Sequence, residues 1–381
     1  MSAATPTPDI TIPTDLLPGD GRFCCGPSKV RPEAVAALAA AAPDYLGTSH
    51  RQPTVRYKVS ELRNGLAELF ALPDGYEIIL GNGGTTAFWD AMTFGLVQER
   101  SHHLSFGEFS SKFATAAKAA PHLADPVIDK TDPGTHPAIP SPGADIDLLA
   151  LTHNETSTGV AMELRRPDGF SGVDRLVAID ATSAAGGLRF DPNQVDCYYF
   201  APQKGFASDG GLWLAAVSPA AIERIERIAA SDRWVPASLD LGIALENSRK
   251  DQTYNTPALA TVFLAAEQVK WMNDNGGLEF AAGRSDRSAE IMYSWAEASS
   301  YATPFVTAPT ERSHVVATVD LDDSVTATVV SDVLRENGIL DTDSYRKLGR
   351  NQLRVAMFPA IDPSDIAALT ACIDFVVERL A

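Results

Sequence analysis

Short apolar segments alternate with helical patterns from about residue 75 to residue 218, and this alternation limits the fold more than any other feature. Each segment is ended by polar, Gly or Pro residues, as is typical of buried strands. Strands that alternate with helices form a mostly parallel sheet with helices on both faces, and ligands gather at the carboxyl ends of its strands. The sequence therefore predicts an α/β fold with a large sheet of this kind. The predicted strands cover residues 76–80, 103–106, 127–128, 147–151, 175–180, 197–200 and 212–217, and helices follow at 85–97 and 110–120.

The pattern changes after about residue 258. A long helix is predicted at 258–273, and Asn275-Gly276-Gly277 is a plausible stop for it. A second helix is expected at 284–298, a helix at 325–337 lies between strands at 315–321 and 353–358, and a last helix covers 363–380. This order predicts a smaller α+β domain at the C-terminal end. A length of 381 residues suits two or three domains.

The charge of the chain excludes several classes of partner. Lys and Arg total 31 and Asp and Glu total 49, so the formal net charge is −18. Such a chain is expected to repel nucleic-acid phosphates and anionic membranes. An anionic small molecule would have to be bound by a local group of Arg, His or backbone N–H groups. The sequence therefore directs attention to such local groups.

The N-terminal residues and the cysteines predict a cytoplasmic protein with reduced thiols. The first twenty residues contain no Lys or Arg and no long apolar segment, so no secretory signal is expected. Cys24, Cys25, Cys197 and Cys372 include no C-x-x-C pair, and adjacent Cys24 and Cys25 have no neighbouring His or Cys at a zinc spacing. Buried free thiols are expected, and no metal site is predicted.

Reactive side chains follow three of the predicted strands. Asp180 ends the apolar run 176–180, Lys204 follows the strand at 197–200, and the residues 153–156 follow the strand at 147–151. A carboxylate after four apolar residues is costly unless it meets a cation or a ligand nitrogen. The spacing of 24 residues between Asp180 and Lys204 fits two adjacent βα units. We therefore expect these two side chains to converge on one small ring.

Such a pair is what pyridoxal phosphate requires. A lysine forms a Schiff base with its aldehyde, and an aspartate keeps the pyridine nitrogen protonated. The glycine loop at 81–86 leads into a helix, whose N-terminal N–H groups suit a phosphate. Phe109 follows another strand end and is placed to stack on the ring.

Each of these features also has an ordinary structural interpretation. A strand-end Asp is often a helix cap, a lone Lys is usually solvated, and Phe109 by itself suits a hydrophobic core. The glycine loop departs from the dinucleotide pattern, because Thr86 stands where the third Gly or Ala belongs. The order of all these features along one predicted sheet favours pyridoxal phosphate.

Eight motifs in order then match a known family. The chain resembles the phosphoserine aminotransferases, which are class-V aminotransferases of the fold-type I pyridoxal phosphate enzymes, over nearly its whole length. The motifs are Cys25-Gly26-Pro27-Ser28, Thr48-Ser49-His50-Arg51, Gly83-Gly84-Thr85, Asn154-Glu155-Thr156, Ala178-Ile179-Asp180, Gln203-Lys204-Gly205, Tyr254-Asn255-Thr256-Pro257 and Leu353-Arg354-Val355.

The resemblance implies a role for each cofactor residue. Lys204 would be the Schiff-base lysine, Asp180 the partner of the pyridine nitrogen, and Phe109 the stacking ring where relatives commonly have Trp. Thr156 would donate to the phenolic oxygen of the cofactor. Many relatives have Arg at the position of Thr85, so one cationic phosphate contact is missing here. The phosphate would be held by Gly84, Thr85 and Gln203, with Asn255 and Thr256 of the second subunit of a homodimer.

The resemblance also implies substrates and domain boundaries. Arg354 would bind the α-carboxylate, a task suited to its planar pair of donors. His50, Arg51 and Arg346 would bind the substrate phosphate or the distal carboxylate of glutamate, although relatives often have His-Arg where this chain has Tyr345-Arg346. The reaction would move the amino group of L-glutamate to 3-phosphohydroxypyruvate by a ping-pong mechanism, giving O-phospho-L-serine and 2-oxoglutarate in serine biosynthesis. The domains would be an N-terminal segment 1–25 packing with the small domain, a large cofactor domain 26–268 and a small domain 269–381.

Two other classes of function remain open at this stage. An alanine–glyoxylate type aminotransferase or a cysteine desulfurase would share the fold, although a desulfurase needs a mobile catalytic Cys. Cys197 and Cys372 lie instead in a strand and a helix pattern. A nucleotide-binding or non-catalytic interaction module could use the same parallel sheet.

Overall fold

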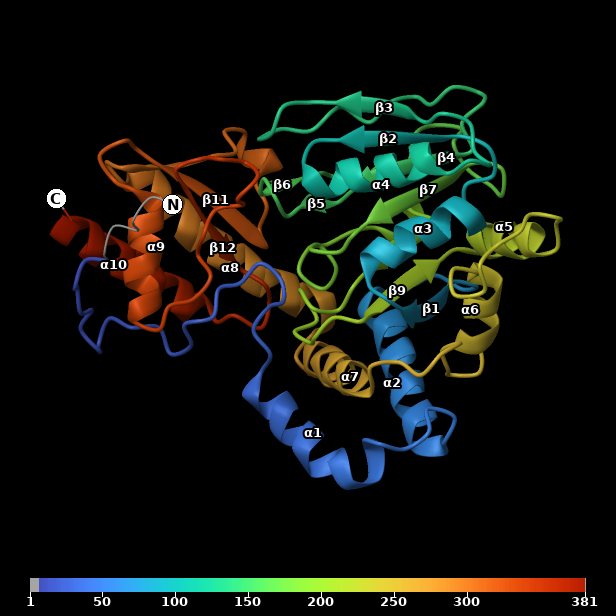
Figure 1. The fold of residues 1–381 in the computed structure, drawn as a ribbon, viewed down its shortest axis with the longest axis horizontal. Coiled ribbons are helices and arrows are strands. Elements are labelled where there is room, and N and C mark those ends of the chain that lie inside the picture. Colours follow the sequence, from blue (N-terminus) through green and yellow to red (C-terminus); the bar gives the residue numbers. More distant parts are fainter. Residues whose placement is uncertain (1–6, 381) are drawn as a thin grey trace, which may run out of the picture.

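A large mixed sheet with helices on both faces occupies the first two thirds of the chain (Figure 1). The computed structural model describes residues 7–380. Along the sheet the strand order is β1-β9-β8-β7-β4-β2-β3. Only β9 runs antiparallel to its two neighbours, so the predicted mostly parallel sheet is confirmed. The strands are β1 (Glu77–Asn82), β2 (Ser101–Ser105), β3 (Val127–Lys130), β4 (Leu148–Thr152), β7 (Leu176–Asp180), β8 (Cys197–Phe200) and β9 (Leu212–Val217).

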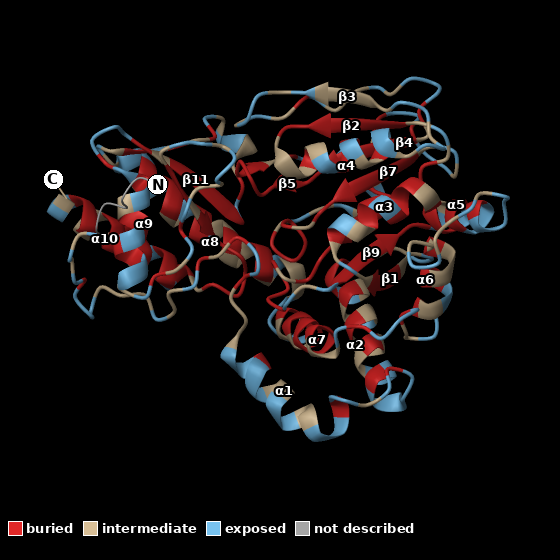
Figure 2. Cartoon of the chain, viewed as in Figure 1, coloured by how far each residue is buried: buried red, intermediate tan, exposed pale blue. Residues whose placement is uncertain are grey.

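Alternate residues of the central strands enter two different hydrophobic clusters. On β7, Val177 and Ile179 pack with helices α2 and α7, whereas Leu176 and Ala178 pack with α3, α5 and α6. Successive side chains of a strand point to opposite faces, so a strand covered on both sides must be apolar throughout. The sheet is accordingly buried along its central strands (Figure 2). The helices of this part are α1 (Pro32–Tyr45), α2 (Pro53–Leu69), α3 (Thr85–Gly95), α4 (Glu108–Ala119), α5 (Pro219–Ala229), α6 (Leu241–Ser248) and α7 (Leu259–Asp274).

A smaller α+β part follows, as the sequence predicts. Its antiparallel sheet has the order β10-β11-β12, with bounds Ala302–Pro304, Val316–Leu321 and Gln352–Ala356. Helices α8 (Gly277–Ala298), α9 (Ala327–Glu336) and α10 (Pro363–Leu380) pack on it around a second core. Ile12 and Phe23 lie in the same core, and Arg22 forms a bridge with Leu340, so the N-terminal segment crosses this part of the molecule. The domain boundaries at 26 and 269 stay a prediction.

The observed elements differ from the predicted ones in a few places. Helices α1, α2, α5 and α6 and strand β10 were not predicted, and α8 begins seven residues before the predicted start at residue 284, at Gly277. Gly276 and Gly277 both have positive φ, of 117° and 69°, so the chain turns within two residues and the second helix starts at once. A hairpin of two short strands, β5 (Asn154–Glu155) and β6 (Val160–Ala161), was also not predicted.

The glycine loop is shorter than the sequence suggests, because its first two residues belong to β1. A Cβ on Gly81 would lie 2.3 Å from the ring of Trp213 on β9, so the glycine lets two strands approach across a large aromatic side chain. The loop proper is Gly83 and Gly84, with φ of 114° and 77°.

The cysteines and the helices bear on two further expectations. All four thiols are free, and Cys25, Cys197 and Cys372 are buried as predicted, whereas Cys24 is partly exposed. Of the helices within residues 7–380, none is long and apolar enough to cross a membrane.

Candidate active site

A cavity of about 370 Å³ lies at the carboxyl edge of the large sheet. Asp180 is the last residue of β7, and Lys204 follows the neighbouring strand β8. Both side chains line this cavity, so the predicted convergence is observed. Seven predicted site residues line it together: Gly84, Thr85, Phe109, Thr156, Asp180, Gln203 and Lys204.

Lys204 is almost completely removed from solvent, with 8% of the residue exposed. Its Nζ donates to the carbonyl oxygen of Cys25 at 2.8 Å and to Thr156 Oγ1 at 3.4 Å. Burial lowers the pKa of Lys204 to about 8, because desolvation disfavours the charged amine. A Cβ on Gly26 would lie 2.9 Å from Nζ, so glycine at this position leaves the amine room. The arrangement gives a lysine that can lose its proton near neutral pH.

Asp180 is 4% exposed and is held by three donors. Its Oδ1 accepts from the backbone N–H of Thr182 at 2.9 Å and from Thr182 Oγ1 at 2.6 Å, and its Oδ2 accepts from Trp89 Nε1 at 3.1 Å. Burial raises the pKa of Asp180, and these hydrogen bonds oppose the rise. A cation placed beside this carboxylate would favour its ionised form further.

The start of α3 offers a place for an anion. Gly84 is the N-cap residue and has no side chain to satisfy the first N–H groups of the helix. Thr85 Oγ1 lies 2.8 Å from Thr182 Oγ1, and the latter hydroxyl uses its hydrogen for Asp180, so Thr85 is the donor between them. The glycine loop and the buried carboxylate are therefore connected by two hydroxyl groups.

Two polar side chains of the cavity have unused hydrogen-bonding capacity. Among the described residues, Gln203 Oε1 and Asn154 Oδ1 are buried without a hydrogen-bond partner. Such atoms are costly unless a ligand or water satisfies them. Together with a buried amine, a buried carboxylate and an uncapped helix start, they fit pyridoxal phosphate.

The residues predicted for substrate anions are less closely grouped. Arg354, on β12, donates from Nη1 to the carbonyl oxygen of Thr156 at 3.2 Å and lies over the ring of Tyr345. Its Nε is buried and, within the described part of the chain, has no partner, so this guanidinium keeps a free donor beside the cavity. Arg346 is exposed on the segment before β12.

The remaining predicted residues do not line this cavity within one chain. His50 Nδ1 lies 3.2 Å from Thr256 Oγ1, and Asn82 donates to the carbonyl oxygens of Asn255 and Thr256. Arg51 is exposed beside His50. A contribution of Asn255 and Thr256 to the site of a second subunit stays a prediction, and so does the binding of substrate anions by His50 and Arg51.

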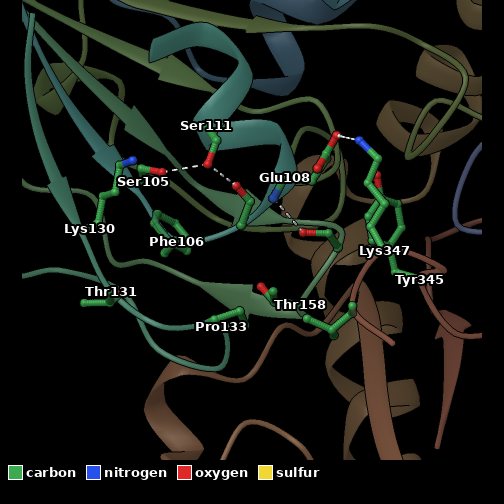
Figure 3. Close-up of a pocket in the computed structure, with 13 residues that line it drawn as sticks. Ser105, Phe106, Glu108, Ser111, Lys130, Thr131, Pro133, Thr158, Tyr345 and Lys347 are labelled. Carbon is green, nitrogen blue, oxygen red and sulfur yellow. Dashed lines mark hydrogen bonds and ion pairs between the residues drawn. The ribbon is translucent and has the colours of Figure 1, made fainter. Parts of the chain in front are cut away.

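A neighbouring cavity of about 280 Å³ lies between the start of α4 and the segment that carries Tyr345 (Figure 3). The Glu108 carboxylate forms an ion pair with Lys347 at 2.5 Å, and the rings of Phe109 and Tyr345 have centroids 6.0 Å apart. The segment before β12 is thereby held beside Phe109.

Several residues of the site were missed by sequence reasoning. Trp89 and Thr182 bind Asp180, and Asn154 lines the cavity. Trp89 lies four residues after Thr85 in α3, on the same helix face, and this spacing could have identified it. Nothing in the sequence pattern distinguishes Thr182.

Comparisons with known proteins agree with this geometry. The aminotransferase class-V family model matches residues 23–342. A protein of Mycolicibacterium vanbaalenii, provisionally named phosphoserine aminotransferase, is 61% identical over 98% of this chain and 99% of its own. The phosphoserine aminotransferase of a Nocardioides species is 58% identical over 98% of this chain and 100% of its own.

Solved structures share the fold at lower identity. A phosphoserine aminotransferase from Cytophaga hutchinsonii has a TM-score of 0.85 at 22% identity and covers 93% of this chain and 99% of its own. A pyridoxal phosphate-bound phosphoserine aminotransferase from Trichomonas vaginalis has a TM-score of 0.81 at 19% identity, with the same coverage of both chains.

Proposed function

Because the chain belongs to the class-V aminotransferases, in the phosphoserine aminotransferase family, we propose that it transfers the amino group of L-glutamate to 3-phosphohydroxypyruvate. The products are O-phospho-L-serine and 2-oxoglutarate, and the reaction belongs to serine biosynthesis. The observation that carries the proposal is the buried pair of Lys204 and Asp180, which follow neighbouring strands and line one cavity. The cofactor is pyridoxal phosphate, which the relative from Trichomonas vaginalis holds.

The predicted site residues that line the cavity each have a proposed role in binding this cofactor. When bound, pyridoxal phosphate supplies an electron sink that makes the α-proton of an attached amino acid acidic. The Asp180 carboxylate would keep the pyridine nitrogen protonated, Phe109 would cover one face of the ring, and Thr156 would hydrogen-bond its phenolic oxygen. The N–H groups at Gly84 and Thr85 and the Gln203 side chain bind the phosphate, joined by Asn255 and Thr256 of the second subunit.

Lys204 attaches the cofactor and later moves a proton. A pKa of about 8 leaves a useful fraction of its amine neutral near pH 7, as attack on an aldehyde requires. With the cofactor and glutamate bound, Lys204 Nζ would be the base that takes the α-proton of the substrate and the acid that returns it. The phosphorylated keto acid then passes through the same steps in reverse.

The substrate anions are bound by a local group of cations in an acidic protein. Arg354 binds the α-carboxylate, which both substrates share. Arg346, with His50 and Arg51, binds either the phosphate of one substrate or the distal carboxylate of the other. The homodimer and the three-part domain division are further parts of this proposal and rest on the resemblance. A cytoplasmic location is also part of it and is supported by the four free thiols.

A comparison of amino donors tests the proposed reaction. Purified protein with pyridoxal phosphate is assayed for amino transfer from phosphoserine to 2-oxoglutarate, and from alanine or serine to glyoxylate. We expect kcat/KM to be highest for phosphoserine. Faster turnover of alanine or serine with glyoxylate would instead assign the chain to the alanine–glyoxylate type, and protein that never gains colour with pyridoxal phosphate would favour a non-catalytic module.

The rate of cofactor capture is expected to depend on pH through Lys204. Since burial lowers the pKa of this amine to about 8, its neutral form increases about tenfold per pH unit below that value and is nearly complete above it. Protein freed of cofactor is mixed with pyridoxal phosphate, and the absorbance change is followed by stopped flow. The rate should rise up to about pH 8 and then level off, whereas an exposed lysine would give a rate that still rises toward about pH 10.

Replacing Arg354 with lysine is expected to weaken both substrates. Lysine keeps the charge but loses the planar pair of donors, so kcat/KM for glutamate and for the phosphorylated keto acid should each fall about 10- to 100-fold. Arg350→Lys is the matched control, because Arg350 is exposed and pairs with Asp320. If only the phosphorylated substrate is affected, Arg354 does not bind the shared carboxylate.

A further inference from the structure

A carboxylate that the mechanism above does not use is completely buried beside the active site. Glu155, at the end of β5, is 0% exposed. No salt bridge to it is found among residues 7–380, so its charge is not balanced by a nearby cation. A buried and unpaired carboxylate is costly unless several donors compensate for lost water. The groups around Glu155 must therefore supply these donors.

Five donors surround this carboxylate. Glu155 Oε2 accepts from the N–H groups of Phe109 at 3.1 Å and Ser110 at 2.9 Å, and from Ser110 Oγ at 2.9 Å. Oε1 accepts from the N–H group of Ser157 at 3.1 Å and from its Oγ at 2.7 Å. The first set belongs to the opening turn of α4, where the helix dipole also favours a negative charge. Oε2 therefore binds the start of α4, whereas Oε1 binds Ser157 and makes a longer contact of 3.4 Å with the N–H group of Phe109.

The backbone is shaped to admit this carboxylate. A Cβ on Gly107, the residue before α4, would lie 2.3 Å from Cγ and 2.4 Å from Cδ of Glu155. The Ser157 hydroxyl that binds Oε1 also accepts from the N–H group of Glu108, at 3.1 Å. The Glu155 side chain therefore links the β5–β6 hairpin to the start of α4.

Each of the two joined segments carries a group close to Lys204 Nζ. Thr156 follows Glu155 directly, and its Oγ1 lies 3.4 Å from Lys204 Nζ. Phe109, whose N–H group is bound by Glu155, has its ring centroid 5.6 Å from the same nitrogen. Holding both segments with one carboxylate fixes the separation between a ring that covers the cofactor face and a hydroxyl that reaches its edge.

We propose that Glu155 is a positioning residue that sets Phe109 and Thr156 around the cofactor ring. The inference rests on the proposed function, because it concerns the fit of pyridoxal phosphate. A carboxylate accepts hydrogen bonds on both oxygens at once. Glutamine cannot replace it, because its NH₂ group is itself a donor. That group would face either the N–H groups at the start of α4 or the N–H group of Ser157. A neutral residue of the same shape therefore loses one of the two attachments.

The direct test is Glu155→Gln in the full-length protein. The dissociation constant of pyridoxal phosphate and the visible circular dichroism per bound cofactor are measured for wild type and variant. We expect the dissociation constant to rise about tenfold and the dichroism of the bound ring to fall, since one set of buried donors loses its acceptor. Glu163→Gln is the matched control: Glu163 is exposed two residues after β6, so the change removes a carboxylate near the same hairpin and leaves Glu155 in place, and both quantities should stay within about twofold of wild type.

Two outcomes separate this inference from the proposed function. If wild type binds pyridoxal phosphate and Glu155→Gln binds it equally tightly with unchanged dichroism, the positioning role is wrong. If wild type itself binds none, the proposed function fails. Should Glu155→Gln not fold, Ser110→Ala and Ser157→Ala each remove one donor from one oxygen. We expect each to raise the dissociation constant about threefold, and wild-type binding and dichroism in both would overturn the inference.

Discussion

Replacing Lys204 with alanine is expected to lower kcat for amino transfer by about 1,000-fold or more. The change removes both the covalent attachment and the base that moves the α-proton, and positioned general bases contribute about 10²- to 10⁴-fold. The visible absorbance of cofactor joined to lysine should also disappear, because the cavity has no other amine within hydrogen-bonding reach of Thr156 among the described residues. Absorbance spectra and steady-state kinetics measure both effects.

Lys112→Ala is the matched control for this substitution. Lys112 Nζ lies 5.1 Å from the centroid of the Phe109 ring, so it is close to the site but outside the cavity. The absorbance spectrum and kcat of Lys112→Ala should stay close to those of wild type. An unchanged spectrum in Lys204→Ala would mean that another lysine attaches the cofactor.

Asp180→Asn is expected to lower kcat by about 100- to 1,000-fold while the protein still binds pyridoxal phosphate. Asparagine can accept one hydrogen bond in the same place but carries no charge, so it cannot hold the pyridine nitrogen protonated. Removing one preorganised electrostatic partner from a water-excluded site typically costs a factor of this size. Kinetics of each half-reaction, followed by absorbance, measure the loss in both directions.

The control for Asp180 is Asp209→Asn. Asp209 is exposed in the loop that carries Lys204, so its removal changes the net charge equally without touching the cavity. Rates for this variant should match wild type. If Asp180→Asn retains wild-type rates while Lys204→Ala does not, the carboxylate does not serve the ring nitrogen.

The sequence predicted the sheet and the central pair because both depend on local patterns. The buried strand β7 is apolar at its first four positions. Asp180, the polar residue that ends it, marks the edge of the sheet. Asp180 and Lys204 could therefore be placed on neighbouring strand ends without knowledge of the fold. The glycine loop and Phe109 were found in the same way.

Other parts of the site could not be predicted, because they depend on contacts between distant segments. Glu155 binds residues 45 and 46 positions away, and the Asn154 side chain donates to Ser183 Oγ, 29 positions away. Such contacts leave no periodic pattern. Helices α1 and α2 were missed although each begins with proline, a residue suited to the first turn of a helix. The roles given to His50, Arg51, Asn255 and Thr256 stay predictions, since none of the four lines the cavity within one chain.

Reduction of the cofactor-loaded protein with borohydride, followed by peptide mapping, tests the central claim most directly. Borohydride fixes pyridoxal phosphate permanently on the nitrogen to which it is bound, and mass spectrometry of the peptides then identifies that residue. We predict a single pyridoxyl group on the peptide that contains Lys204. A pyridoxyl group on a different lysine, or label spread over several exposed lysines, would contradict the account.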